Sequence, residues 1–213
     1  MKSKSPIDKA KIESAIQHLA EDRAFVRKLL WWLRYGNASE RWFQFELAYQ
    51  LDRITGDLIE KHELPPALHQ LSIRHMDRDQ AGTVWFGCQY RGPATDSPAL
   101  VGRATRGKQL ELLEMPRDVL SGLRNYIGSV AANAATGTVA VTSPEGNSLT
   151  VIEAASGRVV ATRPLVEVCG LAPDGAGFLA TTGDGKIVGG AGAIRSEPDY
   201  VWDNHVLRIV AAA

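Results

Sequence analysis

The sequence predicts a mainly β protein with an α-helical hairpin at its N-terminus. Three observations lead to this fold class. Apolar residues recur at the helical period over 5–54, the apolar period changes to two from about residue 50, and a glycine turn recurs about every fifty residues. Four strands repeated at such an interval are typical of a propeller blade, so we expect a partial, about three-bladed propeller-like array. The expected domains are a helical hairpin over 1–54 and propeller-like blades over 55–213.

The helical hairpin is expected from its start signal and its apolar stripes. Ser5-Pro6-Ile7-Asp8 combines a Ser N-cap, a proline at the first helical position and an acid in the first turn. Gly36 ends the first helix, and the second carries Trp42, Phe45 and Tyr49 on one face. A lone hairpin cannot bury so much aromatic surface, so we expect this face to pack on another element.

The blades are expected because a turn recurs in the strand region. "LDRITGDLI" (51–59) and "IEAASGRVV" (152–160) both place an acid, two spacers, a hydroxyl residue and a glycine before an apolar pair, and 105–107 is a fainter copy. Glycine suits such a hairpin turn because the turn requires a positive φ. A second glycine turn precedes a strand at Gly82, Gly137 and Gly177. The predicted blades are the end of one over 51–65, two fuller ones over 69–116 and 126–165, and a shortened one over 168–213.

An arc of three blades leaves strand edges open, because closed propellers have about four to eight blades. Open edges recruit other strands, so we expect a protein partner or self-association through these edges, unless the helices cover them or the chain is a fragment. Nucleic acid and membrane partners are not expected. The 24 Lys and Arg residues balance 24 Asp and Glu residues, and the apolar block at 29–33 is too short to span a bilayer. As written, the chain has no export signal, which favours the cytoplasm.

Catalytic patterns are weak in this sequence. Cys88 and Cys169 lie in apolar, strand-like surroundings without a zinc-type spacing, so we expect two buried free thiols. No Gly-x-Ser-x-Gly motif is present to hold a nucleophilic serine. The sequence therefore favours a non-catalytic binding or scaffold protein over an enzyme.

Four stretches carry a resemblance to a known family. They are "LPPALHQLSIRHMDRDQAGTVWFGCQYRGP" (64–93), "LRNYIGSVAANAATGTVAVTSPEGN" (123–147), "VCGLAPDGAGFLATTGDG" (168–185) and "WDNHVL" (202–207). Over about residues 50–213 the chain resembles the C-terminal half of an uncharacterised bacterial family of twin-arginine-exported, seven-bladed propellers of unknown function. The resemblance implies a periplasmic, non-enzymatic propeller. Its members are often encoded beside imelysin-type iron-uptake proteins, which implies an iron-handling context and an alternative function as a metal-associated periplasmic protein.

The chain departs from that family at its N-terminus, where the helical hairpin stands in place of the export signal and the first several blades. "SERWFQFELAYQL" (39–51) is similar instead to a helix of restriction-endonuclease-like proteins that leads into the nuclease sheet. Such nucleases use an Asp and an acid-x-Lys pattern to hold a divalent metal, which Asp174, Asp184 and Lys186 match literally. Asp-Gly at 174–175 and at 184–185 is also a turn dipeptide, and this favours hairpin turns. A metal-dependent nuclease stays the minor alternative.

Histidines supply the candidate binding residues. His69 and His75 flank the first strand of a blade, and His205 follows Asp203-Asn204. Inner strands line the central channel of a propeller, a neutral imidazole binds transition metals, and a neighbouring carboxylate orients it. His69 and His75 lie about 20 Å apart on an extended strand, so they cannot share one metal. The alternative is that these are structural histidines, with Arg74 and Asp203 as an ion pair.

The candidate ligand-binding residues are His69, Arg74, His75, Asp203 and His205. No cofactor is certain from the sequence, a transition metal is the one candidate cofactor, and its ligands stay open.

Overall fold

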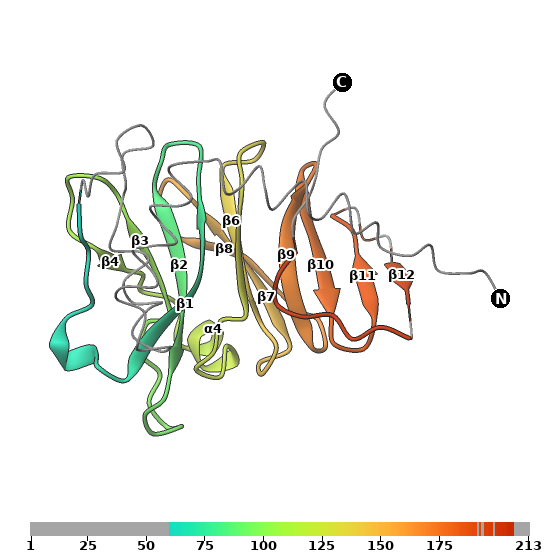
Figure 1. The fold of residues 1–213 in the computed structure, drawn as a ribbon, viewed down its shortest axis with the longest axis horizontal. Coiled ribbons are helices and arrows are strands. Elements are labelled where there is room, and N and C mark those ends of the chain that lie inside the picture. Colours follow the sequence, from blue (N-terminus) through green and yellow to red (C-terminus); the bar gives the residue numbers. More distant parts are fainter. Residues whose placement is uncertain (1–59, 191, 193, 198, 207–213) are drawn as a thin grey trace, which may run out of the picture.

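A computed structural model describes residues 60–190, 192, 194–197 and 199–206. These residues form three four-stranded antiparallel sheets, which confirms the mainly β, partly propeller-like prediction (Figure 1). The predicted helical hairpin over 1–54 lies outside the described residues, as does the turn at 51–59.

Each sheet is a meander whose spatial order follows the chain. The first sheet contains β1 (Leu71–Arg78), β2 (Val84–Tyr90), β3 (Val101–Ala104) and β4 (Glu111–Leu112). The second contains β5 (Ser129–Asn133), β6 (Thr138–Ser143), β7 (Ser148–Glu153) and β8 (Val159–Pro164). The third contains β9 (Val168–Asp174), β10 (Gly177–Thr182), β11 (Lys186–Val188) and β12 (Ile194–Ser196). A 3₁₀ turn, η1 (Pro66–Leu68), precedes β1, and a short helix, α4 (Arg117–Gly122), joins the first two sheets.

The sheets stand beside one another as blades (Figure 1). β1 contacts β5, and β5 contacts β9, so the first strand of each sheet lies on the inner side of the arc. The "IEAASGRVV" turn joins β7 to β8, the two outermost strands of the second blade. Gly107 and Gly157 occupy equivalent turns and share a φ of +75°, as the recurrence predicts.

The third blade is shortened, as predicted: it has four strands, but β11 and β12 have only three residues each. One predicted turn is misplaced, because Gly177 was expected in the turn before its strand. The positive φ of its first hairpin belongs to Gly175, at +55°, because the turn is tighter than in the other blades, and Gly177 is already the first residue of β10.

The hydrophobic core lies between the blades. On β6, Val139 and Val141 join the cluster shared with the first blade, whereas Ala140 joins the cluster shared with the third. Successive strand residues point to opposite faces, so the middle blade is buried on both sides and reads as a continuous apolar run. Cys88 and Cys169 are free and buried, as expected. No helix within the described residues is long and apolar enough to cross a bilayer.

Candidate functional site

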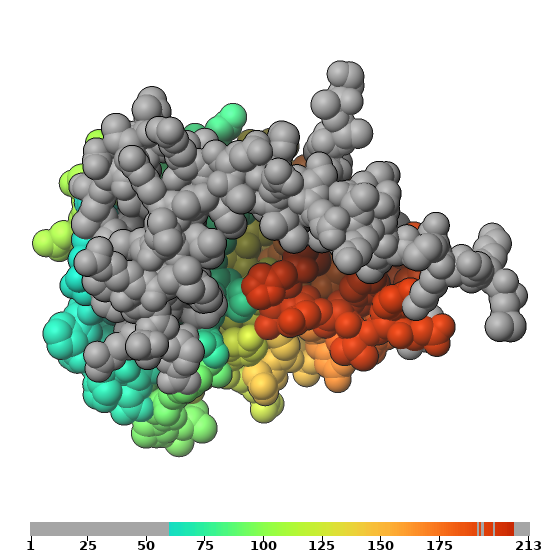
Figure 2. Space-filling view, viewed as in Figure 1, coloured from blue at the N-terminus to red at the C-terminus, as the bar shows by residue number. Residues whose placement is uncertain are grey.

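The last described residues of the chain contact all three blades or the segments that join them. Residues 197 and 199–206, which we call the C-terminal strap, follow β12 and turn back towards β1 (Figure 1). At the third blade, the Glu197 N–H donates to the Gly185 carbonyl at 2.9 Å. In the space-filling view, the red atoms of this end of the chain form a band over the blades (Figure 2).

Two glycines allow the strap to approach the inner strands. A Cβ on Gly170 of β9 would lie 2.6 Å from Cγ2 of Val206, well inside van der Waals contact. A Cβ on Gly128, just before β5, would lie 3.0 Å from Oδ1 of Asn204. The strap therefore packs on backbone, at positions where any larger residue would push it away.

One hydrogen bond fixes the strap to the segment between α4 and β5. The Asn204 side-chain amide donates to the hydroxyl oxygen of Tyr126 at 2.8 Å. Burial raises the pKa of Tyr126, and the hydrogen bond from Asn204 acts in the opposite direction. Within the strap, the rings of Tyr200 and Trp202 stack with centroids 5.5 Å apart.

The strap brings a histidine onto the first blade. The ring centroids of His75 and His205 lie 5.2 Å apart, with the rings tilted by 55°. The pairing of β1 with β2 shifts register between Ile73 and His75, so Arg74 is the extra residue of a β-bulge. The bulge leaves Arg74 unpaired with β2, next to His75 in the middle of β1.

His75 is held in its neutral form. Its pKa falls from the ordinary 6.5 to about 4, first because it is buried, and then because His205 and Arg74 lie nearby, while Asp203 acts in the opposite direction. A neutral imidazole has one nitrogen lone pair available as an acceptor or a metal ligand.

Four of the five predicted residues therefore come together. We call the group the inner-end cluster; it contains Arg74, His75, Tyr126, Asp203, Asn204 and His205. His69 is the exception, because it is exposed and follows η1 at the far end of the approach to β1. Among the described residues, no ion pair joins Arg74 to Asp203, so that predicted pair does not form there.

Sequence reasoning missed Tyr126 and Asn204. Asn204 stands between two residues that were singled out, so its position was a usable signal. No sequence signal pointed to Tyr126, because it is 78 residues from Asn204 along the chain and contacts it only in the folded protein. In the part of the chain that the structure describes, no three His, Cys, Asp or Glu side chains form a group that could hold a metal ion.

The cysteines do not supply a nucleophile. Burial raises the pKa of the Cys88 thiol. Burial also raises the pKa of Cys169, with Asp203 and Glu167 adding to the shift, and its Sγ–H donates to the Glu167 carbonyl at 3.0 Å. Both thiols therefore stay protonated near neutral pH, and a protonated thiol is a poor nucleophile.

The literal nuclease pattern does not form a site. Asp174 ends β9 and Asp184 follows β10, so the two acids lie at opposite ends of one hairpin, about 20 Å apart by strand rise. Asp184 pairs with Lys186 and accepts a hydrogen bond from the Thr182 hydroxyl at 2.5 Å. Asp174 accepts one from the Gly190 N–H at 3.0 Å. These acids stabilise turns, as the competing interpretation predicted.

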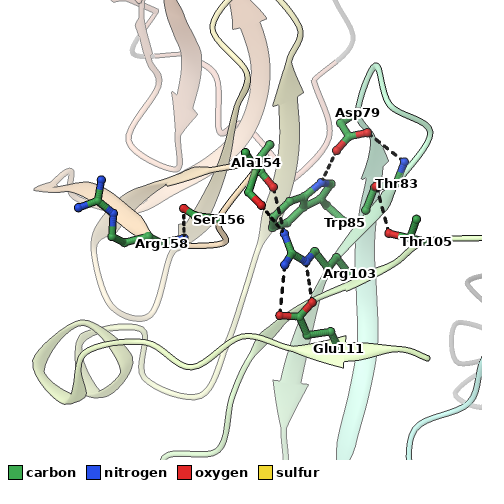
Figure 3. A network of polar contacts seen from close by, with 10 residues as sticks. Asp79, Thr83, Trp85, Arg103, Thr105, Glu111, Ala154, Ser156 and Arg158 are labelled. Carbon is green, nitrogen blue, oxygen red and sulfur yellow. Dashed lines mark hydrogen bonds and ion pairs between the residues drawn. The ribbon is translucent and has the colours of Figure 1, made fainter. Parts of the chain in front are cut away.

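A second polar assembly lies where the first two blades meet (Figure 3). The Arg103 guanidinium makes two hydrogen bonds to the Glu111 carboxylate, at 2.8 and 3.3 Å. It also donates to the Ala154 carbonyl at 3.0 Å and lies 5.5 Å from the ring centroid of Trp85. Because Ala154 belongs to the turn after β7, one side chain ties the two blades together.

Residues 42–209 match the model of a family described as "Protein of unknown function (DUF1513)". The chain belongs to this family. No curated protein matches its sequence.

Solved structures resemble the chain over part of their length. A catalytically inactive virginiamycin B lyase from Staphylococcus aureus, solved with quinupristin, is 14% identical, with 67% of this chain and 45% of that chain covered and a TM-score of 0.47. The calcium-binding protein regucalcin from Agrobacterium tumefaciens is 15% identical, with 73% and 52% covered and a TM-score of 0.43. The chain thus spans about half the length of these proteins.

Proposed function

We propose that this chain is a non-catalytic binding module built on an incomplete β-propeller, and that the inner-end cluster is its binding surface. One observation carries the proposal. The strap and β1, from the two ends of the described chain, place His205 and His75 with ring centroids 5.2 Å apart. The surrounding side chains add a guanidinium, a carboxylate, a phenol and an amide, which together recognise polar groups of either charge.

Binding is favoured over catalysis by the state of the reactive side chains. The two thiols have raised pKa values, and neither is placed as an activated nucleophile. His75 has a depressed pKa, but it makes no hydrogen bond to a serine, threonine or cysteine among the described residues. Among the described residues, His75 is therefore not paired with a side-chain nucleophile of the kind that covalent catalysis uses.

The partner we propose is another protein rather than a second copy joined through β8. The Leu165 N–H donates to the Asn147 carbonyl at 2.8 Å, so by the alternation of an antiparallel ladder Pro164 faces away from β7. The free edge of β8 therefore has a proline, and it also has exposed Arg163 and a register shift near Val151. Proline, charge and irregular register all oppose the addition of another strand.

The test compares partner capture by three immobilised proteins. These are the unchanged chain, a His75→Ala/His205→Ala variant, and a His69→Ala control that alters an exposed histidine outside the cluster. A protein that the unchanged chain and the control retain, and that the double variant loses, is then purified and its affinity is measured by calorimetry. Equal affinity for the double variant overturns the cluster as the surface. Turnover of a substrate that depends on His75 overturns the non-catalytic proposal.

A metal-associated function is the second candidate, and the histidine pair favours it. His75 is neutral at pH 7, and two adjacent imidazoles are suitable ligands for copper, zinc or nickel. The resemblance to the exported propeller family adds an iron-handling context. Protein purified without chelator is analysed for iron, copper and zinc, and is then titrated with Zn²⁺ and Cu²⁺ by calorimetry. A metal-free protein without affinity for either ion removes this candidate.

We also propose that the chain corresponds to the last three blades of a seven-bladed, twin-arginine-exported propeller that works in the periplasm. The four family-like stretches of sequence support this proposal. Light scattering after size exclusion tests the alternative that copies of this chain close a ring by themselves: a closed dimer would hold six blades and contradict the seven-bladed proposal, whereas a monomer contradicts closure by copies. Fractionation of cells that express the full gene product tests the location, and cytoplasmic recovery contradicts export.

A further inference from the structure

The first two blade junctions differ in one residue at equivalent positions. Asp79 precedes Gly82-Thr83-Val84, and Asn133 precedes Gly137-Thr138-Val139, each pairing with its threonine at the end of a hairpin. Asn133 points across to the third blade, where its amide donates to the Gly177 carbonyl at 2.7 Å and the Gly175 carbonyl at 3.1 Å. These bonds close the junction between the second and third blades.

The Asp79 side chain instead makes its hydrogen bonds within the first blade. Its carboxylate accepts hydrogen bonds from the Trp85 indole N–H at 2.8 Å and from the Thr83 N–H at 2.9 Å (Figure 3). No bond from Asp79 reaches the second blade, and a cleft of about 580 Å³ lies at this junction. That volume falls within the range of small-molecule sites in proteins.

The cleft has a fixed wall. Arg103 is held by Glu111 and by the Ala154 carbonyl, so its charge is neutralised and its position is set. Small side chains from both blades leave the space open: Ala81, Ala134, Gly137, Ala154 and Ala155.

Two charged groups in the cleft have no oppositely charged partner among the described residues. The Asp79 carboxylate is bonded only by the neutral donors of Trp85 and Thr83. Lys108 lines the same cleft and is exposed; its backbone N–H donates to the Thr105 carbonyl at 3.0 Å, but its side-chain ammonium has no hydrogen bond or ion pair with the described residues. Gln80 and Gln109 add amide donors and acceptors at the rim. Within the part of the chain that the structure describes, the Lys108 ammonium and the Asp79 carboxylate have no ionic partner. With the two amides they complement a ligand that carries both charges and a peptide bond.

We propose that this cleft binds a small zwitterionic ligand, a free amino acid or a short peptide, with its carboxylate at Lys108 and its ammonium at Asp79. Fully anionic or fully cationic ligands are disfavoured, because each would face one like charge in the cleft. This site shares no lining residue with the inner-end cluster, so its test does not depend on the proposed function.

The experiment titrates the full chain with four matched ligands, by ¹H–¹⁵N correlation spectra and calorimetry. They are alanyl-alanine, its N-acetyl derivative, its C-terminal amide, and the derivative with both ends blocked. A ligand of this size gives a Kd of roughly 1 mM, and blocking either end weakens binding about tenfold. The largest shifts are expected for the amides of residues 80–83 and 105–109.

Variants assign each charge to its partner. Lys108→Gln weakens alanyl-alanine about tenfold but leaves the affinity for the C-terminal amide unchanged, since that ligand has no carboxylate to lose. Arg117→Gln, an exposed charge change on α4, leaves all four affinities unchanged. Asp79→Asn weakens alanyl-alanine but leaves the affinity for its N-acetyl derivative unchanged, since that ligand has no ammonium to lose. The unfolding transition of this variant is measured first, because Asp79 also accepts a hydrogen bond from Trp85. Equal binding of the four ligands, no binding of any of them, or an unaltered pattern in Lys108→Gln overturns the proposal.

Discussion

His75 on β1 and His205 on the C-terminal strap face each other across the inner end of the arc, with ring centroids 5.2 Å apart. One belongs to the first described strand and the other to the last described segment. The contact therefore forms only when the three blades and the strap are in place together. It makes the strap part of the tertiary structure of the arc rather than a loose end.

This arrangement predicts a loss of stability in mild acid. The pKa of His75 is about 4 in the folded protein and 6.5 ordinarily, so between these values the unfolded chain binds more protons. The contribution of His75 to the free energy of unfolding is fully present above about pH 6.5 and is lost as the pH falls through about 4. The full loss from this residue is about 3 kcal/mol, at ~1.4 kcal/mol per pKa unit. Urea unfolding measured from pH 4 to pH 7.5 gives the slope of the unfolding free energy against pH.

Two variants separate His75 from other titrating groups. His75→Gln removes the titration and flattens this part of the slope. His69→Gln alters an exposed histidine outside the cluster and keeps the slope of the unchanged protein. A slope in His75→Gln equal to that of the unchanged protein would show that other groups cause the acid sensitivity.

The second prediction concerns the approach of the strap to β9. Gly170→Ala places a Cβ 2.6 Å from Cγ2 of Val206, so the strap has to move or the strand has to bend. Overpacking of this kind costs about 1–3 kcal/mol of unfolding free energy. Gly122→Ala is the matched control, because nothing lies within 4 Å of its added Cβ. Denaturant unfolding of both variants provides the comparison, and equal stability would mean that the strap does not press on Gly170.

The repeat architecture was predictable from the sequence because local chemistry determines it. Glycine is required where a hairpin turn has a positive φ, so the recurrence of Gly107 and Gly157 identified two outer hairpins with the same φ. Period-two apolar runs then identified the strands between the turns. The third blade was predicted as shortened, but the bounds of β11 and β12 were not predicted, because strands of three residues are too short to leave a clear period-two pattern.

The candidate site was only partly predictable, because long-range contacts leave no local pattern. His75 and His205 were found from residue type alone, since imidazoles near an inner strand suggest binding. Tyr126 and Arg103 could not be found in this way. Their roles depend on Asn204 and on the Ala154 carbonyl, which reach them only when separate blades pack together.

The third prediction tests how the strap is fastened. Tyr126→Phe and Asn204→Ala each remove the 2.8 Å hydrogen bond between these two side chains. Each single variant loses about 1 kcal/mol of unfolding free energy, and the double variant loses less than the sum. A double-mutant cycle by urea unfolding measures the coupling. Strict additivity would mean that the two side chains do not interact in solution.

The last prediction concerns the tie between the first two blades. Arg103→Lys keeps the charge, but a lysine has no planar fork to hold both Glu111 oxygens and the Ala154 carbonyl together. The Arg103 side chain is only 20% exposed and its bond to the Ala154 carbonyl is partly buried, so that carbonyl is poorly rehydrated when the bond is lost, whereas the 52% exposed Glu111 regains water. The expected loss is about 2 kcal/mol of unfolding free energy. Arg195→Lys is the matched control, because Arg195 also pairs with a glutamate but is 75% exposed, and we expect a loss below about 0.5 kcal/mol. Urea unfolding of both variants measures the difference, and equal losses would mean that Arg103 contributes no more than a surface ion pair.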